Sequence, residues 1–318
     1  MMALRAAVVN TSGRPLLSPA GRAAQVGRLA SLGVRCEEMG PDEQESGPHG
    51  YSVATAERRA EVLAAALTSP DYPVVWAAQG GFGATEILPR LAGLLPVTLP
   101  PTLFVGFSDS CALGAWLATH RPDVGFLHAT HALDPRLLTG RRSDLAALLR
   151  RLHGAAPPVT GTTTFAAQPG RRVEAVVTGR AVPLNLSVAA CLTAVLTPPA
   201  RAVLLLEDVD DDLRRLLRAL DVLACAGWLR RARAVVLGEF TACRDERGGA
   251  LDVTRLAAAV AERTDAPVHL WPEFGHGRAR TPLPFGLSLR LEQRPNGTGT
   301  LGPVDASPDP TPKELRVP

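Results

Sequence analysis

The chain has 318 residues, of which 46% are hydrophobic and 20% are charged, and its formal net charge is +3. This length allows two packed domains with sizeable cores, and the composition argues against disorder of the whole chain. The arginines are spread among acidic residues without a basic block, so a nucleic-acid partner is not indicated, and no apolar run approaches the length of a membrane span.

Lysine and cysteine usage excludes further classes. The only lysine is Lys313, in a Pro-rich segment, so a Schiff base, a pyridoxal phosphate site, a Ser-Lys dyad and a Walker-type loop are not expected. The five cysteines are widely spaced and form no C-x-x-C pair, which favours buried free thiols over disulfides or a zinc site. Polar residues and a proline interrupt the first 17 residues, so we expect no signal peptide and a cytoplasmic location.

The first half alternates short apolar runs with helical patterns, which predicts a parallel sheet covered by helices. The expected strands are 4–9, 73–78, 102–107 and 124–127, and the expected helices are 20–32, 55–67, 85–94 and 110–120. Between residues 136 and 168 the composition shifts to Arg, Gly, Pro and Thr around a basic helix at 144–152. We interpret this segment as a linker between an N-terminal domain at 1–135 and a C-terminal domain at 169–293.

The second half continues the alternation. The expected strands are 173–178, 202–206, 234–240 and 267–270, the expected helices are 185–196, 212–227 and 253–263, and 280–292 resembles strand and turn material. Residues 294–318 are rich in Gly, Pro, Asp and Thr, which predicts a disordered tail. The fold class predicted for the whole chain is therefore α/β, with a parallel-sheet N-terminal domain and a smaller C-terminal α/β domain.

The segment 103–113 is a candidate nucleophile seat. Its apolar strand ends at Ser108 and a helix follows, as in a strand-turn-helix elbow that exposes a hydroxyl and aims backbone N–H groups at a ligand. The hydrolase pattern G-x-S-x-G is matched at Gly106 and Ser108, but its last position holds Ser110. The alternative is that Ser108 or Asp109 caps the helix.

A serine nucleophile also needs a base, an acid and oxyanion donors. The glycine-rich turn at 79–83 follows a second strand and could supply backbone donors, although it could equally be a tight turn or a phosphate cradle. Glu207 follows a strongly apolar strand and is the candidate acid, with Glu239 as its competitor. Asp208 could instead cap the next helix.

Among the seven histidines, His276 lies in a glycine-flanked loop that could present its side chain to a cleft. A loop histidine of this kind can also be incidental. His128 and His131 could suggest a metal pair, but no third ligand with suitable spacing accompanies them, and no metal or organic cofactor is expected.

Four short motifs in one order give the pattern its specificity. They are QGGFGA at 79–84, GFSD at 106–109, LEDV at 206–209 and FGH at 274–276. Together they resemble the LD-carboxypeptidase family, cytoplasmic serine peptidases that include muramoyltetrapeptide carboxypeptidases and microcin C immunity hydrolases. The resemblance covers about residues 5–290, with a smaller echo at Arg58-Arg59.

The resemblance implies a role for each matching residue. Ser108 falls on the family's nucleophile, Glu207 on its acid and His276 on its base. The family's oxyanion donors, which are backbone amides, fall on Gly81 and Asp109. The implied fold has a serine-bearing N-terminal domain and a C-terminal domain that supplies acid and base, with the active site at their interface, often in a homodimer.

The sequence departs from the family in residues that would face the substrate. Gln79 and Phe82 replace the arginine and tyrosine of the usual RGGYG, and Pro183 and Leu184 replace the paired glycines of a GGN segment that ends here at Asn185. The reaction type is therefore better indicated than the substrate.

The implied reaction is hydrolysis of the amide to the terminal D-alanine of a murein tetrapeptide, in cell-wall recycling. One alternative is a hydrolase of a peptidyl-nucleotide antibiotic, with Trp76, Trp116 or Trp271 as an aromatic platform. The other is a catalytically silent protein that binds a peptide carboxylate or phosphate. Retention of all three triad residue types argues against the second alternative.

Overall fold

The computed structural model describes residues 3–40, 46–155, 159–165, 175–294 and 296–304. These residues form two compact units. Unit 1 contains the described residues up to 155, and unit 2 contains those from 159 to 304. Each unit has its own sheet and its own hydrophobic core.

Unit 1 is an open parallel sheet. Its elements are β1 (Leu4–Val9), α1 (Pro19–Ser31), β2 (Val34–Met39), α2 (Ala56–Thr68), β3 (Val74–Ala77), α3 (Ala84–Leu94), β4 (Thr102–Gly106), the 3-10 turn η1 (Ser108–Ser110), α4 (Cys111–His120), β5 (Val124–His128) and α5 (Arg142–Leu152). The strands lie in the order β5-β4-β3-β1-β2 and pair in parallel. From β1 the chain adds β2 on one side of the sheet and then β3, β4 and β5 on the other side, so the strand order reverses between β1 and β3. In open α/β sheets, ligands bind at the carboxyl ends of the strands at such a point.

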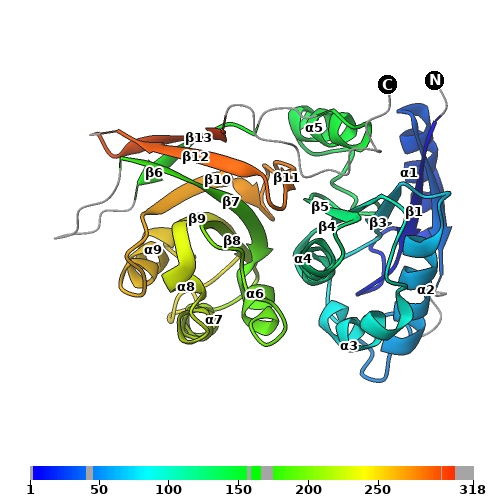
Figure 1. The fold of residues 1–318 in the computed structure, drawn as a ribbon, viewed down its shortest axis with the longest axis horizontal. Helices are drawn as coiled ribbons and strands as arrows, with labels where there is room; N and C mark the ends of the chain where they lie inside the picture. The colour runs from blue at the N-terminus through cyan, green and yellow to red at the C-terminus, as the bar shows by residue number, and fades with distance from the viewer. Residues whose placement is uncertain (1–2, 41–45, 156–158, 166–174, 295, 305–318) are drawn as a thin grey trace. The chain divides into compact units, whose positions relative to one another are not determined.

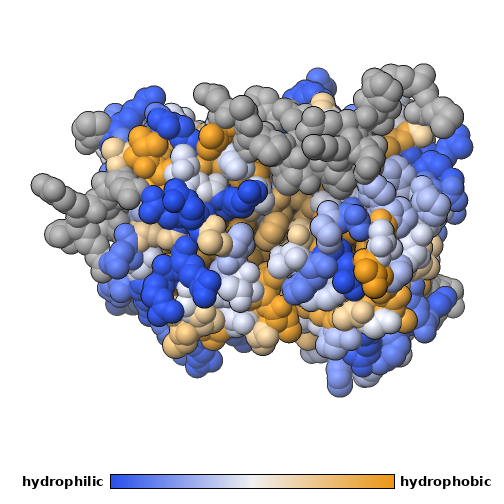
Figure 2. All heavy atoms as spheres, in the orientation of Figure 1, coloured by the Kyte–Doolittle hydropathy of each residue, from blue (hydrophilic) through white to orange (hydrophobic). Residues whose placement is uncertain are grey.

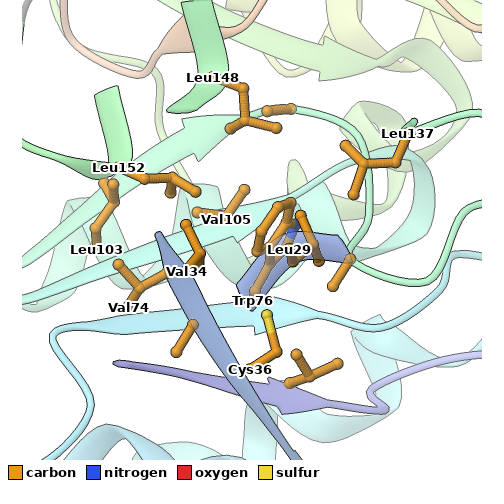
Figure 3. Packing of buried hydrophobic residues seen from close by; sticks show 14 of the residues in the cluster. Leu29, Val34, Cys36, Val74, Trp76, Leu103, Val105, Leu137, Leu148 and Leu152 are labelled. Atoms are coloured by element: carbon orange, nitrogen blue, oxygen red, sulfur yellow. The ribbon is translucent and has the colours of Figure 1, made fainter. Parts of the chain in front are cut away.

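The core of unit 1 lies between the sheet and helices α1 and α5. Trp76 of β3 is fully buried there, with Leu29 of α1 and Leu148 and Leu152 of α5 packed in the same cluster (Figure 3). Helices α2, α3 and α4 pack together along the other face of the sheet (Figure 1). Both faces are therefore covered, as the continuous apolar strands of a parallel sheet require.

Polar residues fix where several helices begin. The Ser18 hydroxyl accepts the Gly21 N–H at the start of α1, and Pro19 occupies the first helical position, where no intrahelical donor is lost. At the start of α2 the Thr55 hydroxyl accepts the Arg58 N–H. These caps explain why the helices begin within one residue of the predicted positions.

Unit 2 is built on a closed barrel. Its elements are β6 (Gly161–Phe165), β7 (Val176–Asn185), α6 (Leu186–Leu192), β8 (Ala202–Val209), α7 (Leu213–Cys225), α8 (Trp228–Arg231), β9 (Ala232–Thr241), α9 (Val253–Ala261), β10 (Val268–Gly275), β11 (Leu283–Pro284), β12 (Ser288–Gln293) and β13 (Thr298–Pro303). The barrel order is β10-β6-β13-β12-β7-β8-β9. The neighbours from β7 to β10 pair in parallel, and β12, β13 and β6 close the barrel with antiparallel pairs.

Unit 2 is α/β as predicted for the C-terminal half, but its sheet closes into a barrel, which was not predicted. Helices α6 to α9 pack against β7 to β10, on the parallel side of the barrel (Figure 1). The second core cluster contains fully buried Trp271 and Phe274 of β10 together with Leu289 of β12. Short strands from the predicted linker and tail complete this barrel.

Two predicted irregular segments contain regular structure. In the predicted linker at 136–168, the expected helix at 144–152 is confirmed as α5, which packs its leucines into the core of unit 1, whereas β6 was not predicted and joins the barrel of unit 2. In the predicted disordered tail, residues 298–303 form β13, so the prediction is wrong there. Pairing with β6 and β12 and burial of Leu301 explain the order of β13. Residues 305–318 of that tail lie outside the described residues.

Surface residues are mixed in character. On the face seen in Figure 2, hydrophilic and hydrophobic residues are interspersed, as on ordinary protein surfaces. Within the described residues, every helix is too short or too polar to cross a membrane.

Candidate active site

Ser108 occupies the turn that follows β4. Its φ is +54°, a left-handed conformation that costs a non-glycine residue about 1 kcal/mol, and its side chain is half-buried while its neighbours are buried. Neither Ser108 nor Asp109 acts as the expected cap, because α4 begins at Cys111 without a side-chain cap. The strained turn therefore presents the Ser108 hydroxyl at the carboxyl edge of the sheet.

The glycine turn after β3 packs against Ser108. A Cβ atom built on Gly80 would lie 3.1 Å from the Ser108 Cβ and 3.3 Å from its Oγ, which is tighter than ordinary side-chain contacts, so glycine favours this close approach. The Gly13 N–H donates to the Gly80 carbonyl at 3.0 Å. Because a trans peptide points its C=O and N–H in opposite directions, the Gly81 N–H is directed away from Gly13.

Asp109 connects the two turns through its side chain. Its Oδ2 accepts the backbone N–H of Ala84 at 2.9 Å, which caps α3 in place of Gly83, a residue without a side chain. Burial raises the pKa of the Asp109 carboxyl, and this hydrogen bond and the charge of Arg59 oppose that effect. No local sequence pattern predicts this bond, because its two residues lie 25 positions apart.

Arg59 holds the glycine turn in place through hydrogen bonds from its guanidinium. Its guanidinium is fully buried and donates to the carbonyls of Thr11 and Gly83 at 2.8 and 2.7 Å, and it pairs with Glu86 at 2.6 Å. A Cβ atom on Gly83 would lie 2.7 Å from this guanidinium, and the φ of Gly83 is +109°. The Arg58-Arg59 motif formed part of the family resemblance, but its sequence did not predict that Arg59 holds the glycine turn.

Glu207 lies inside β8 rather than after it, because β8 continues to Val209. The β8–β9 register shifts between Leu206 and Asp208, so Glu207 lies at an irregularity of the kind that re-aims side chains near active sites. Its side chain is fully buried. Burial raises the pKa of the Glu207 carboxyl, and the adjacent His276 opposes this.

His276 directly follows β10 and contacts Glu207. Its Nδ1 lies 2.5 Å from Glu207 Oε2, so we assign a proton to Nδ1 that is donated to the carboxylate. His276 is 6% exposed as a residue, so its side chain is buried and not openly presented to solvent. Arg280 donates to the carbonyls of His276 and Gly277 at 3.1 and 3.3 Å and holds this loop.

Glu239, the competing acid, has a different partner. Its carboxylate accepts the Thr241 hydroxyl at 3.3 Å and packs against Gly277, where any Cβ atom would collide with it. The expected histidine contact is therefore made by Glu207.

Asp208 has a structural role instead of the proposed capping role. Its carboxylate accepts hydrogen bonds from the Asn185 amide, from the Ser187 backbone N–H and hydroxyl, and from the Val209 N–H, at 2.7–2.9 Å. Burial raises its pKa, and these hydrogen bonds oppose the rise. Asp212 is the residue that caps α7.

The candidate residues thus fall into two groups. Ser108, Gly81 and Asp109 lie on adjoining turns of unit 1, and Glu207 and His276 form a hydrogen-bonded pair in unit 2. Two family models match the chain: the LD-carboxypeptidase N-terminal domain over residues 7–129 and the LD-carboxypeptidase C-terminal domain over residues 178–291. The chain belongs to the LD-carboxypeptidase family.

Relatives agree with this membership. The chain is 31% identical over 255 residues to the murein tetrapeptide carboxypeptidase of Pseudomonas aeruginosa. The aligned segment covers 76% of this chain and 80% of the relative. The muramoyltetrapeptide carboxypeptidase structure from Oxalobacter formigenes has a TM-score of 0.73 at 23% identity, over 95% of this chain and 99% of that one. The structure of the microcin C7 self-immunity protein MccF in complex with aspartyl sulfamoyl adenosine has a TM-score of 0.72 at 15% identity, over 95% of this chain and 96% of that one. Both structures share the fold of this LD-carboxypeptidase family member.

Proposed function

We propose that this protein is a serine-type LD-carboxypeptidase that hydrolyses the amide to the terminal D-alanine of murein tetrapeptides. The observation that carries the proposal is the 2.5 Å contact between His276 Nδ1 and Glu207 Oε2. A buried carboxylate that fixes the tautomer of a histidine is the supporting half of a serine hydrolase triad. The similarity to the murein tetrapeptide carboxypeptidase supports the substrate.

The proposed reaction proceeds through an acyl-enzyme. Ser108 Oγ attacks the carbonyl carbon of the scissile amide while His276 Nε2 removes the hydroxyl proton. The backbone N–H groups of Gly81 and Asp109 stabilise the oxyanion. His276 then gives its proton to the departing D-alanine nitrogen, and water, activated by the same imidazole, releases the shortened peptide and restores Ser108. Glu207 stays ionised and orients His276 throughout, and no metal or organic cofactor takes part.

The cellular part of the proposal is recycling of wall peptides in the cytoplasm by a homodimer. It rests on the family resemblance alone. Light scattering of the purified protein measures the oligomeric state directly, and a monomeric mass at working concentrations would contradict the dimer.

The test is mass spectrometry of L-Ala-γ-D-Glu-meso-diaminopimelate-D-Ala incubated with the protein. We expect the parent to release D-alanine and Ser108→Ala to release none. Ser31→Ala is the matched control, because Ser31 bonds only a carbonyl of its own helix on an exposed face. Absence of release by the parent would contradict the murein substrate.

One observation bears on the antibiotic-directed alternative. Trp76 and Trp271 are fully buried and Trp116 is 8% exposed, which argues against the expected tryptophan platform. An exposed aromatic pair is formed by Tyr51 and by Phe82 of the glycine turn, with ring centroids 6.2 Å apart. Cleavage of a peptidyl-adenylate analogue by the parent, weakened in Phe82→Ala, would favour this alternative. Equal affinity of parent and Ser108→Ala for the tetrapeptide, without turnover, would favour a binding protein.

A further inference from the structure

His131 lies on the loop after β5, outside the proposed triad. The backbone N–H groups of residues 132–133 donate to the carbonyl oxygens of residues 77–78 at 3.0 Å each. The indole N–H of Trp76 donates to the carbonyl of Thr130 at 2.9 Å. The loop is thus fixed to the end of β3 on both sides of His131, next to the start of the glycine turn.

The buried imidazole of His131 contacts the turn that carries Ser108. Its Nε2 lies 3.0 Å from the hydroxyl of Ser110, which is also buried. That hydroxyl accepts the Phe107 N–H at 2.9 Å and donates its one proton to the Phe107 carbonyl at 2.8 Å. We therefore assign a proton to His131 Nε2, which donates it to this hydroxyl.

The same imidazole contacts the glycine turn. A Cβ atom built on Gly80 would lie 2.9 Å from His131 Cε1 and 3.1 Å from the Ser108 Cβ. The imidazole and the candidate nucleophile therefore both lie against the same side of Gly80. One ring edge touches both the turn that presents Ser108 and the turn whose Gly81 amide is the proposed oxyanion donor.

We propose that His131 is a positioning residue that holds the Ser108 turn and the Gly80–Gly81 turn in a fixed spacing. A rigid imidazole with one donated hydrogen bond and one packing contact sets both turns against the end of β3. The Ser108 turn needs such support because its left-handed conformation is unfavourable for serine. Small errors in the spacing of nucleophile and oxyanion donor are costly, about 10²-fold in rate for 1 Å.

The test compares three variants of the full chain. His131→Leu keeps a side chain of similar size without a donor, and His131→Gln carries an amide N–H that can replace Nε2–H. His120→Leu is the control, since His120 is an exposed histidine of unit 1 whose Nδ1 contacts the Trp116 carbonyl at 2.9 Å. The readouts are kcat and KM for D-alanine release and the rate at which a fluorophosphonate probe modifies Ser108, followed by mass spectrometry.

We expect His131→Leu to lower kcat and the modification rate by about 10²-fold with KM changed less than about twofold. His131→Gln should recover most of this loss, and His120→Leu should resemble the parent. Parent-like kinetics in His131→Leu would overturn the proposal. Equal losses in the Leu and Gln variants, with equal losses of melting temperature, would also overturn it, because that is the result of packing alone.

The inference rests on the proposed function, but the two can fail separately. If the parent releases no D-alanine while the probe still modifies Ser108, only the substrate is wrong, and the modification rates test His131. Absence of any modification of Ser108 in the parent overturns both. If His131→Leu does not fold, the ring ¹⁵N shifts of His131 in the parent decide, and an unprotonated Nε2 would refute the assigned hydrogen bond.

Discussion

His276 Nδ1 reaches Glu207 Oε2 because a glycine, Gly275, ends strand β10 directly before His276. The two residues come from β10 and β8, which are separated in the barrel by β9. A Cβ atom on Gly275 would lie 3.2 Å from the Glu207 Cβ and 2.8 Å from the Glu239 carbonyl oxygen, and the φ of Gly275 is +131°. The glycine before His276 is thus required by the approach of the candidate base to its acid.

Substitutions of the proposed triad should lower activity in a graded order. Ser108→Ala and His276→Ala should each reduce kcat by about 10⁶-fold, and Glu207→Gln by about 10⁴-fold, because an amide retains part of the contact with the imidazole. The measurement is single-turnover release of D-alanine. Melting temperatures should stay within a few degrees of the parent for Ser108→Ala.

Glu239→Gln is the matched control for the acid. Its carboxylate bonds Thr241 and packs on Gly277, so we expect a change in kcat of less than about tenfold. A larger loss in Glu239→Gln than in Glu207→Gln would reverse the assignment of the acid.

Replacing Ser108 by glycine should separate strain from chemistry. Both Ser108→Gly and Ser108→Ala lose the hydroxyl, but only glycine adopts a φ of +54° without penalty, so Ser108→Gly should be the more stable by about 1 kcal/mol. Urea unfolding measures the difference. At Ser143, an exposed position in α5, the same pair should show the opposite order because alanine favours helix. Greater stability of the alanine variant at both sites would mean that Ser108 is not strained.

Gly275→Ala should disrupt the acid–base pair. The added methyl group meets Glu207 and the β9 backbone, so we expect kcat to fall by at least about 10²-fold together with a loss of stability. Gly248→Ala is the control, because its φ is +81° but nothing lies within 4 Å of the added atom. It should lose a similar amount of backbone stability and keep its kcat. Equal kcat in the two variants would contradict the close approach at Gly275.

Periodicity predicted the elements of unit 1 well because most of them are buried and apolar. Strand 4–9 agrees with β1, and the helix starts follow from Ser18 and Thr55. The missed strand, β2, is an edge strand whose sequence VRCEEM alternates buried and exposed residues with few apolar ones. Its order comes from pairing with β1, which no local pattern contains.

The barrel of unit 2 was not predicted, because long-range pairing decides it. Strand β7 extends through Gly179 and Pro183 to Asn185, where the sequence favoured a break. β6 and β13 are polar and rich in Thr and Gly, and they become strands only as partners of one another and of the barrel.

The candidate site was predicted from motif order rather than from spacing. The sequence placed Glu207 and His276 together through the family resemblance, and the hydrogen bond between them agrees. The contacts made by the Asp109 side chain, the Arg59 guanidinium and His131 were not predicted, because each partner group is distant in sequence.

The buried His269 should make the protein less stable in acid. Burial lowers its pKa from 6.5 to about 4, so the folded state holds it neutral with its Nδ1 3.2 Å from Thr163 Oγ1. Below pH 6.5 the unfolded chain binds a proton that the folded chain does not, so stability falls as the pH decreases to about 4 and then levels off. At about 1.4 kcal/mol per pH unit, this group contributes a loss of about 3 kcal/mol.

His269→Gln should remove that loss while retaining a polar partner for Thr163. We expect the difference in unfolding free energy between about pH 7 and about pH 4 to be smaller in this variant than in the parent by about 3 kcal/mol. Urea titrations followed by circular dichroism at both pH values measure it. His49→Gln, at an exposed turn, should behave like the parent, because its surroundings change little on unfolding. A parent-like pH dependence in His269→Gln would mean that the imidazole takes up its proton in the folded barrel, and that burial among β6 and β10 does not exclude the charge.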